Sequence, residues 1–206
     1  MRLMRPEKRN AISQTMLEEI RANLTLAADD PTTRVLLIEG VPGIFCAGGD
    51  LTWVKHHDVV VARRYNELSL DMHQAIRDFP SPTVAVIDGL CIGGGCNIAL
   101  ACDIRLASQD ASFSIPAVRH GIVYDQPSIA RLVELVGPGK ASHFLFTARR
   151  IGSEQAVSIG LVDVLCRDLA EGVAMFLEDL KAADSQSVRG IRARIRTVRA
   201  QGGNER

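Results

Sequence analysis

Residues 82–108 read PTVAVIDGLCIGGGCNIALACDIRLAS, and this stretch decides the fold. Its first part, Thr83–Ile87, is a continuous apolar run, which is typical of a strand buried on both faces. Three consecutive glycines, at positions 93–95, precede the apolar helical segment CNIALAC, and Asp103–Ala107 returns as a strand. Strand, helix and strand in this order predict a βα crossover, and therefore an α/β fold.

The same alternation continues on both sides of this stretch. Ser13 is a candidate cap for a first helix, in which Met16, Leu17, Ile20, Leu24 and Ala27 fall at helical spacing. Further expected elements are a strand at Arg34–Glu39, one helical region over about Leu51–Phe79, and helices at Gln126–Val136, Gly139–Phe146, Ser153–Ile159 with Ser153 as cap, Leu169–Ala183 and Val188–Gln201. The arginines of the last helix are expected mainly on a solvated face, with a patch for subunit contact or a phosphorylated ligand as the alternative.

Composition excludes several classes of function. Lys+Arg and Asp+Glu are both 24 in 206 residues, so the charge balance does not indicate a nucleic-acid or membrane partner. No apolar run approaches the ~20 residues of a membrane span, and the N-terminus is not a signal peptide, so we expect a cytoplasmic protein. The five cysteines lack the CxxC spacing of zinc sites and are expected to be reduced thiols; no metal site is expected.

Two glycine-containing loops are the candidates for binding a substrate carbonyl through backbone amides. They are FCAGGDL at Phe45–Leu51 and DGLCIGGGCN at Asp88–Asn97, and each follows or adjoins a predicted strand. Small residues let backbone amides approach a ligand, and the start of a helix leaves amides unpaired. One amide from each loop, aimed at a thioester carbonyl, would stabilise a developing oxyanion by about 3–4 kcal/mol per donor. The triple glycine alone also fits a tight strand–helix turn, and the G-x-G-x-x-G dinucleotide pattern is not present.

Five ordered stretches, residues 5–13, 45–51, 82–108, 113–122 and 132–163, resemble the enoyl-CoA hydratase/isomerase (crotonase) superfamily. The resemblance implies a ββα superhelix with C-terminal trimerisation helices, divided into a core domain at 1–165 and a helical oligomerisation segment at 166–206. It also implies homotrimers or hexamers and an acyl-CoA or acyl-carrier thioester substrate, with no cofactor beyond that thioester. Both ends are short for the family, so part of the lid over CoA and of the trimer-capping helices is expected to be reduced.

The resemblance also assigns roles to individual residues. It places the oxyanion amides at Ala47 and Gly94, with the loop residues Gly48, Gly49 and Asp50 beside the substrate. The adenine and phosphate end of CoA falls at Lys8, Arg9 and Ala11.

Two departures from the hydratase pattern bear on the reaction. Family hydratases carry a glutamate after the Gly-Gly-Gly-Cys turn, where this chain has Asn97, and a second glutamate where it has Ala117. Adding water across a double bond needs a carboxylate to activate the water and an acid to protonate carbon. Hydration by the usual mechanism is therefore not expected, although Asn97 and Ala117 should still contact the substrate.

Tyr124 and Asp125 are the candidates for the reaction-specific groups. Asp125 falls where dienoyl-CoA isomerases place a catalytic aspartate and chlorobenzoyl-CoA dehalogenases their nucleophile, and Tyr124 falls where methylmalonyl-CoA decarboxylases place a tyrosine. The alternative is structural, with Tyr124 packing at an interface and Asp125 capping the helix that begins near Gln126. His120 is a further candidate for a polar or acid–base group in the pocket, whereas His73 is expected at the surface or at an interface.

The sequence thus predicts a crotonase-type lyase or isomerase that acts through a thioester enolate. Decarboxylation of a malonyl-type thioester and double-bond isomerisation by Asp125 are the two leading reactions. A hydratase-type lyase that uses non-standard residues is one alternative. A catalytically inactive homologue that binds acyl thioesters or scaffolds a partner is the other.

Overall fold

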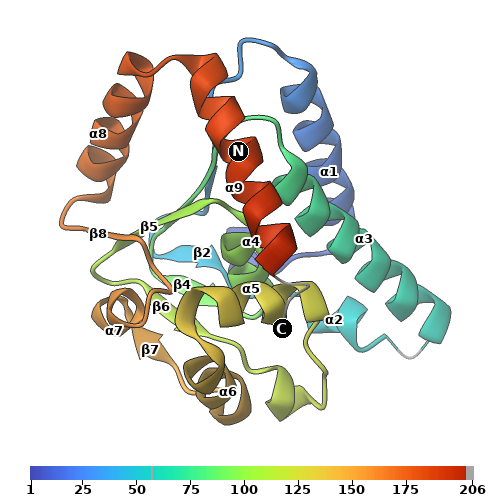
Figure 1. Ribbon diagram of the computed structural model, residues 1–206. Helices are drawn as coiled ribbons and strands as arrows, with labels where there is room; N and C mark the ends of the chain where they lie inside the picture. The colour runs from blue at the N-terminus through green and yellow to red at the C-terminus, as the bar shows by residue number, and fades with distance from the viewer. Residues whose placement is uncertain (57, 203–206) are drawn as a thin grey trace.

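The computed structural model describes residues 1–56 and 58–202, which form two four-stranded sheets surrounded by helices (Figure 1). The first sheet is parallel throughout, with the order β1 (Leu36–Glu39), β3 (Thr83–Ile87), β5 (Ile104–Ser108) and β8 (Val164–Cys166). The second has the order β2 (Ile44–Cys46), β4 (Leu90–Ile92), β6 (Ser112–Ser114) and β7 (Ile151–Gly152), and only β7 is antiparallel to its neighbour.

Each of the first three strands of the parallel sheet leads directly into a strand of the second sheet. The pairs β1–β2, β3–β4 and β5–β6 repeat this step, and each pair is followed by helical segments. The chain therefore advances as a superhelix of ββα turns, which confirms the expected fold class. The helices are α1 (Gln14–Asp29), α2 (Leu51–Val54), α3 (Val59–Asp78), α4 (Gly94–Ala101), α5 (Gln126–Val136), α6 (Pro138–Thr147), α7 (Ser153–Ser158), α8 (Leu169–Ala182) and α9 (Ser185–Gly202), with 3-10 turns η1 (Pro6–Lys8) and η2 (Ala117–His120).

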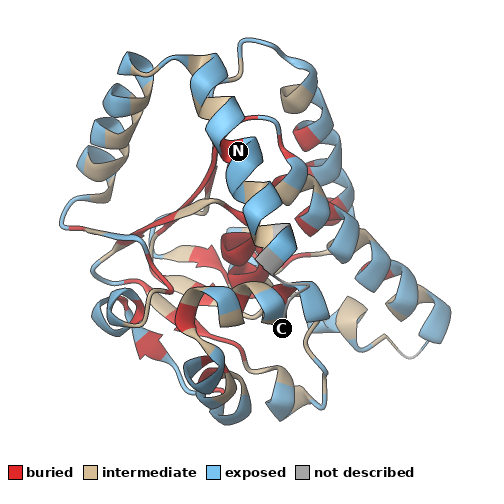
Figure 2. Cartoon of the chain, viewed as in Figure 1, coloured by how far each residue is buried: buried red, intermediate tan, exposed pale blue. Residues whose placement is uncertain are grey.

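The core lies between the sheets and around α4. All five residues of β3 are buried, as expected for a parallel strand covered on both faces, and seven of the eight residues of α4 are buried as well (Figure 2). The five cysteines are free thiols and all are buried, which agrees with the sequence prediction. The described residues contain no cluster of three or more His, Cys, Asp or Glu that could hold a metal ion.

Two helix predictions need correction. The single helix expected over 51–79 is divided into α2 and α3, because Asp58 starts a new helix by accepting hydrogen bonds from the amides of Val60 and Val61. Ser153 does not cap α7: Gly152 occupies the cap position, and the Ser153 hydroxyl donates to the carbonyl of Gln109 at 2.7 Å. By contrast, Ser13 caps α1 as predicted, since its Oγ accepts from the amide of Met16 at 3.2 Å.

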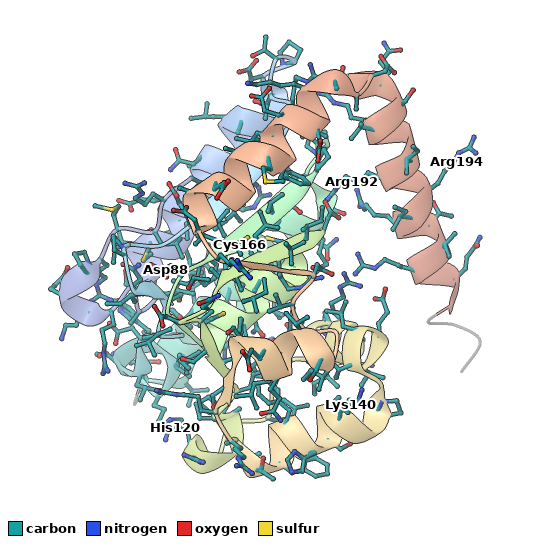
Figure 3. The ribbon with its side chains drawn as sticks, turned by 90° about the vertical axis from the view of Figure 1, so that its left-hand side faces the viewer. Asp88, His120, Lys140, Cys166, Arg192 and Arg194 are labelled. Atoms are coloured by element: carbon teal, nitrogen blue, oxygen red, sulfur yellow. The ribbon has the colours of Figure 1, made fainter. Side chains whose placement is uncertain are left out.

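The C-terminal helix docks through one buried arginine. Arg192 on α9 is 7% exposed, pairs with the carboxylate of Asp103 at 2.6 Å, and donates to the carbonyls of Arg77 and Phe79. Figure 3 shows Arg192 turned toward the core and Arg194 turned away from it. The expectation that the arginines of this helix lie mainly on a solvated face is therefore wrong for Arg192. No helix in the described part of the chain is long and apolar enough to cross a membrane. The oligomeric state stays a prediction.

Candidate active site

A cavity of about 650 Å³ lies where β2, β4 and β6 end. The loops that follow these strands form one side of it, and α3, η2 and the segment before α5 form the rest. The residues predicted to meet the substrate that lie on its wall are Ala47, Gly48, Gly49, Gly94, Asn97, Ala117, His120, Tyr124 and Asp125.

The two glycine loops approach so closely that side chains would not fit between them. A Cβ on Gly94 would lie 3.0 Å from the amide nitrogen of Gly49. Gly48 has a φ of +104°, a conformation that disfavours residues with a side chain, and a Cβ there would lie 3.0 Å from the carbonyl of Ile92. Glycine is thus required at this junction because backbone meets backbone.

The amides of Gly49 and Gly94 form the candidate oxyanion hole. Gly94 is the first residue of α4, so its amide has no acceptor within the helix. The amide of Ile12 donates to the carbonyl of Gly48 at 2.8 Å, and the carbonyl of Ile12 accepts from the amide of Asp50 at 2.9 Å. The amide of Gly49, which lies between them in the chain, takes part in neither hydrogen bond. Within the described residues, neither the Gly49 nor the Gly94 amide has a hydrogen-bond acceptor. The partial positive charge at the start of α4 adds to the attraction for an anion.

The assignment of Ala47 as an oxyanion donor is wrong. Its amide already donates to the carbonyl of Arg9 at 3.0 Å, which ties η1 and the following turn to the end of β2. The free amide of this loop lies two residues further along, at Gly49. Ala47 still lies on the cavity wall, so its contact with the substrate stays a prediction.

Tyr124 supports the turn that carries Gly94. Its hydroxyl donates to the carbonyl of Gly93 at 3.0 Å. Burial, together with the nearby thiol of Cys96 and the carboxylate of Asp125, raises the pKa of Tyr124 well above its usual value of 10. The phenol is therefore neutral at physiological pH, and it donates its proton in the hydrogen bond to the Gly93 carbonyl.

Asp125 serves as a helix cap and also lies on the cavity wall. One carboxylate oxygen accepts from the amide of Ser128 at 2.9 Å, at the start of α5. The other accepts from the side-chain amide of Asn97 on α4, also at 2.9 Å. The capping alternative considered from the sequence is confirmed, and the same geometry leaves the carboxylate beside the substrate cavity.

His73 is not at the surface, contrary to the expectation from the sequence. It is 1% exposed on the inner face of α3. Burial lowers the pKa of His73 from 6.5 to about 4, with the Asp125 carboxylate opposing this shift and Arg77 reinforcing it. The ring is therefore neutral at physiological pH.

The residues expected around the CoA nucleotide lie away from the cavity wall. Lys8 and Arg9 are exposed at η1, and the carbonyl of Ala11 accepts from the guanidinium of Arg5 at 2.9 Å. Their role in CoA binding stays a prediction. Asp50 is also not among the residues on the cavity wall, and its contact with the substrate stays a prediction. Although burial opposes it, hydrogen bonds from Arg5 and Thr52 lower the pKa of Asp50, which caps α2.

The sequence reasoning missed the part of the wall that α3 supplies. Asn66, Ser69 and Leu70 follow helical i, i+3, i+4 spacing and face the cavity, and Tyr65 donates to the carbonyl of Ile12 at 2.8 Å. The available signal was a pair of polar residues, Asn66 and Ser69, one turn apart on the same helix face.

Comparison with known proteins identifies the family of this chain. A family model described as enoyl-CoA hydratase/isomerase matches residues 1–197. The crotonyl-CoA hydratase of Syntrophomonas wolfei is 36% identical over 160 residues, 77% of this chain and 62% of that protein. The enoyl-CoA isomerase/hydratase fer4 of Mycosarcoma maydis is 31% identical over 187 residues, 82% of this chain and 68% of that protein.

A solved structure extends the likeness to nearly the whole chain. The crystal structure of an enoyl-CoA hydratase/isomerase family protein from Hyphomonas neptunium superposes with a TM-score of 0.92 at 31% identity, covering 97% of this chain and 78% of that one. The chain belongs to the enoyl-CoA hydratase/isomerase family. It spans 62% of the length of the Syntrophomonas relative, so the activity of the whole protein is a matter for proposal.

Proposed function

We propose that the protein isomerises a double bond in an acyl-CoA or acyl-carrier thioester, with Asp125 as the proton shuttle. The observation that carries this proposal is the Asp125 carboxylate on the cavity wall, held in place by Asn97 and by the amide of Ser128. It is the one carboxylate among the described residues that line the cavity. A fixed base beside a bound thioester is what proton abstraction next to a carbonyl requires.

The reaction divides into two proton transfers. Asp125 removes a proton from the α-carbon of a 3-enoyl thioester, and the electrons of the broken C–H bond move into a dienolate. The oxyanion of this dienolate would accept hydrogen bonds from the Gly49 and Gly94 amides, which are already in place and need little reorganisation. Asp125 then returns the proton to the γ-carbon, which gives the conjugated 2-enoyl thioester and restores the carboxylate.

Decarboxylation is the second candidate, because loss of CO₂ forms an enolate without a base. Three features make it less favourable here. Within the described residues, the cavity wall has no Lys or Arg to bind a substrate carboxylate, and Asp125 would repel one. The Tyr124 proton, which the decarboxylase interpretation needs, is donated to Gly93.

Hydration and a purely structural role are the remaining alternatives. The side chains at positions 97 and 117 still provide no carboxylate, so the usual hydration mechanism has no acid–base pair. A scaffold would not require the free amides of Gly49 and Gly94 to adjoin a cavity.

The direct test is turnover of 3-hexenoyl-CoA by the purified protein, followed by the ultraviolet absorbance of the conjugated product. We expect turnover in the wild type and a decrease of ~100-fold or more in Asp125→Asn. Asp125→Asn keeps the side-chain size and can still cap α5, so the melting temperature should change little. Full activity in this variant, or turnover of malonyl-CoA but not of 3-hexenoyl-CoA, would overturn the proposal.

A further inference from the structure

A second cavity, of about 810 Å³, lies between α9, the end of α3 and α5. It shares no lining residue with the candidate active-site cavity. In Figure 1, α9 runs past the end of α3 toward α5. Four arginines from these three helices lie on its wall, and we call it the arginine cavity: they are Arg77 on α3, Arg131 on α5, and Arg196 and Arg199 on α9.

The positive charges on this wall exceed the negative ones. Three carboxylates also line the cavity, and each is already paired: Asp78 with Arg196, Asp103 with the buried Arg192, and Glu134 with both Arg131 and Arg199. Arg77 forms no ion pair with a described residue, and its guanidinium donates to the side chain of Gln74 at 2.8 and 3.0 Å. Because Arg192 already neutralises Asp103, two carboxylates remain for four arginines, and two positive charges on the wall lack a matching negative charge.

Other charges change this balance only from a distance. Burial lowers the pKa of Arg77, and the carboxylates of Asp125 and Asp78 oppose this shift. Asp125 lies on the wall of the active-site cavity, and both of its oxygens already accept hydrogen bonds there. It therefore reduces the excess charge at Arg77 without occupying the arginine cavity.

Arg131 has an unused hydrogen-bond donor inside the protein. Its side chain is 12% exposed, and its Nε is buried and hydrogen-bonds to no described residue. Burial and the nearby charges of Arg199 and Arg105 lower the pKa of Arg131, while Glu134 opposes this shift. Buried donors in folded proteins are nearly always paired. An unpaired guanidinium N–H on the wall of a cavity with excess positive charge indicates a place for an anionic acceptor.

The chemistry of the wall defines the anion that fits. Guanidinium groups present planar pairs of N–H donors, which match the oxygens of phosphate and carboxylate groups. A phosphate group brings close to two negative charges and three strong acceptor oxygens, which corresponds to the two uncompensated charges on the wall, whereas a single carboxylate brings one charge. The uncharged part of the wall is mainly apolar and could contact an organic group attached to the phosphate: it includes Ala101, Pro127, Ala130, Val133, Pro138 and Val198.

We propose that the arginine cavity binds a phosphate group, either free or carried on a small organic molecule, at a site separate from the acyl thioester. The phosphate oxygens would accept from Nε of Arg131 and from the guanidinium groups of Arg77 and Arg199. Because these arginines belong to α5, α3 and α9, a bound phosphate would join three helices and stabilise the folded protein. The inference does not depend on the proposed isomerase activity.

The experiment measures binding of inorganic phosphate and of phenyl phosphate by titration calorimetry, at constant ionic strength and at about pH 8, above the second pKa of phosphate groups. We expect both to bind the wild type. Equal affinities would identify free phosphate as the ligand, and tighter binding of phenyl phosphate would identify an organic phosphate that uses the apolar wall. Arg131→Gln should weaken binding ~10-fold or more, as for the loss of one charge-assisted hydrogen bond.

Two further variants separate a binding site from a network of ion pairs. Glu134→Gln should strengthen phosphate binding several-fold, because the carboxylate that competes for Arg131 and Arg199 is removed. Arg194→Gln is the matched control, since Arg194 is exposed on α9 and is turned away from the core in Figure 3. It should leave the affinity unchanged. Should Arg131→Gln not fold, Arg199→Gln provides the same comparison.

Several results would overturn the inference. These are no binding of either phosphate, equal affinity in the wild type and Arg131→Gln, or weaker binding in Glu134→Gln. Displacement of bound phosphate by free CoA would make the cavity part of the CoA site and would overturn its separateness. If neither phosphate binds and Arg131→Gln dissociates an oligomer, the arginines serve subunit contact instead. None of these results bears on turnover of 3-hexenoyl-CoA, so the proposed function is tested independently.

Discussion

The side-chain amide of Asn97 donates a 2.9 Å hydrogen bond to the carboxylate of Asp125, across the gap between α4 and the start of α5. This contact gives a physical reason for the departure from the hydratase pattern. A glutamate at position 97 would bring a second carboxylate close to Asp125 in a partly buried place, where like charges repel strongly. Asparagine at this position is therefore compatible with Asp125.

Restoring the two hydratase carboxylates should succeed only if Asp125 is neutralised. We expect Asn97→Glu with Ala117→Glu to remain nearly inactive in hydrating crotonyl-CoA, because the carboxylate introduced at position 97 would be repelled by Asp125 or protonated. Adding Asp125→Asn removes the repulsion, and detectable hydration should appear. The measurement is the loss of absorbance of crotonyl-CoA. Equal hydration by the double and triple variants would show that the contact between positions 97 and 125 does not control the reaction.

The oxyanion hole should be sensitive to a single methyl group. Gly94→Ala places a Cβ about 3 Å from the Gly49 amide, where the thioester oxygen would bind. We expect turnover to decrease by ~100-fold or more, while binding of free CoA changes little. Gly139→Ala on α6 is the matched control, since a Cβ there has open space around it. Similar losses in both variants would point to a general effect on folding.

Tyr124→Phe tests whether the tyrosine supports the turn or takes part in the chemistry. Loss of its hydrogen bond to Gly93 should lower the free energy of unfolding by ~1 kcal/mol. Isomerisation should decrease only several-fold, because the Gly94 amide loses support but the base remains. Kinetics at saturating substrate and a thermal melt separate the two effects. A loss of ~100-fold without loss of stability would instead give Tyr124 a direct catalytic role.

Removing the buried guanidinium of Arg192 should loosen α9. Arg192→Leu removes the cation paired with the partly buried Asp103 carboxylate, which keeps its hydrogen bonds from Thr83, and it removes the side-chain donor to two backbone carbonyls. We expect a loss of ~3 kcal/mol in the free energy of unfolding, measured by chemical denaturation. Arg194→Leu on the same helix changes an exposed residue and should have little effect.

His73 should make stability depend on pH in a defined window. Because its pKa is about 4 in the folded protein and 6.5 in the unfolded chain, unfolding takes up a proton between these values. The contribution of His73 is fully present above pH 6.5 and is lost as the pH falls toward 4, by ~3 kcal/mol in total. Denaturation at about pH 7 and about pH 4.5 should show a smaller pH effect in His73→Leu than in the wild type. An identical pH effect in both proteins would mean that the histidine is not buried in its neutral form.

The sequence was sufficient for the elements whose signal is local. The apolar run at Thr83–Ile87 and the glycines before α4 predicted a buried strand, a turn and a helix in their observed places. The second sheet was not predicted, because strands such as β4 and β6 have three residues each and are too short to show a period. The error at Ala47 has a different cause. The position of a residue in a motif does not show that its backbone amide donates to the carbonyl of Arg9.

His73 shows a different limit of sequence reasoning. Its helical position was evident, but its burial depends on which face of α3 meets α4, and that is set by tertiary packing. Asp125 was predicted either to cap a helix or to act in catalysis. The structure supports the capping role and leaves the catalytic one to experiment.

The close contact of backbone with backbone at Gly48 and Gly94 has an evolutionary consequence. The candidate donors to the thioester carbonyl are backbone amides, so they do not depend on which side chains surround them. Mutations on α3, α4 and the segment before α5 can therefore replace the reactive groups one at a time without releasing the ligand's carbonyl. Proteins with this architecture could change the reaction that they catalyse while they continue to bind the same kind of acyl thioester. Asn97 and Ala117 are two positions where such a change in reaction would first appear as a change of side chain.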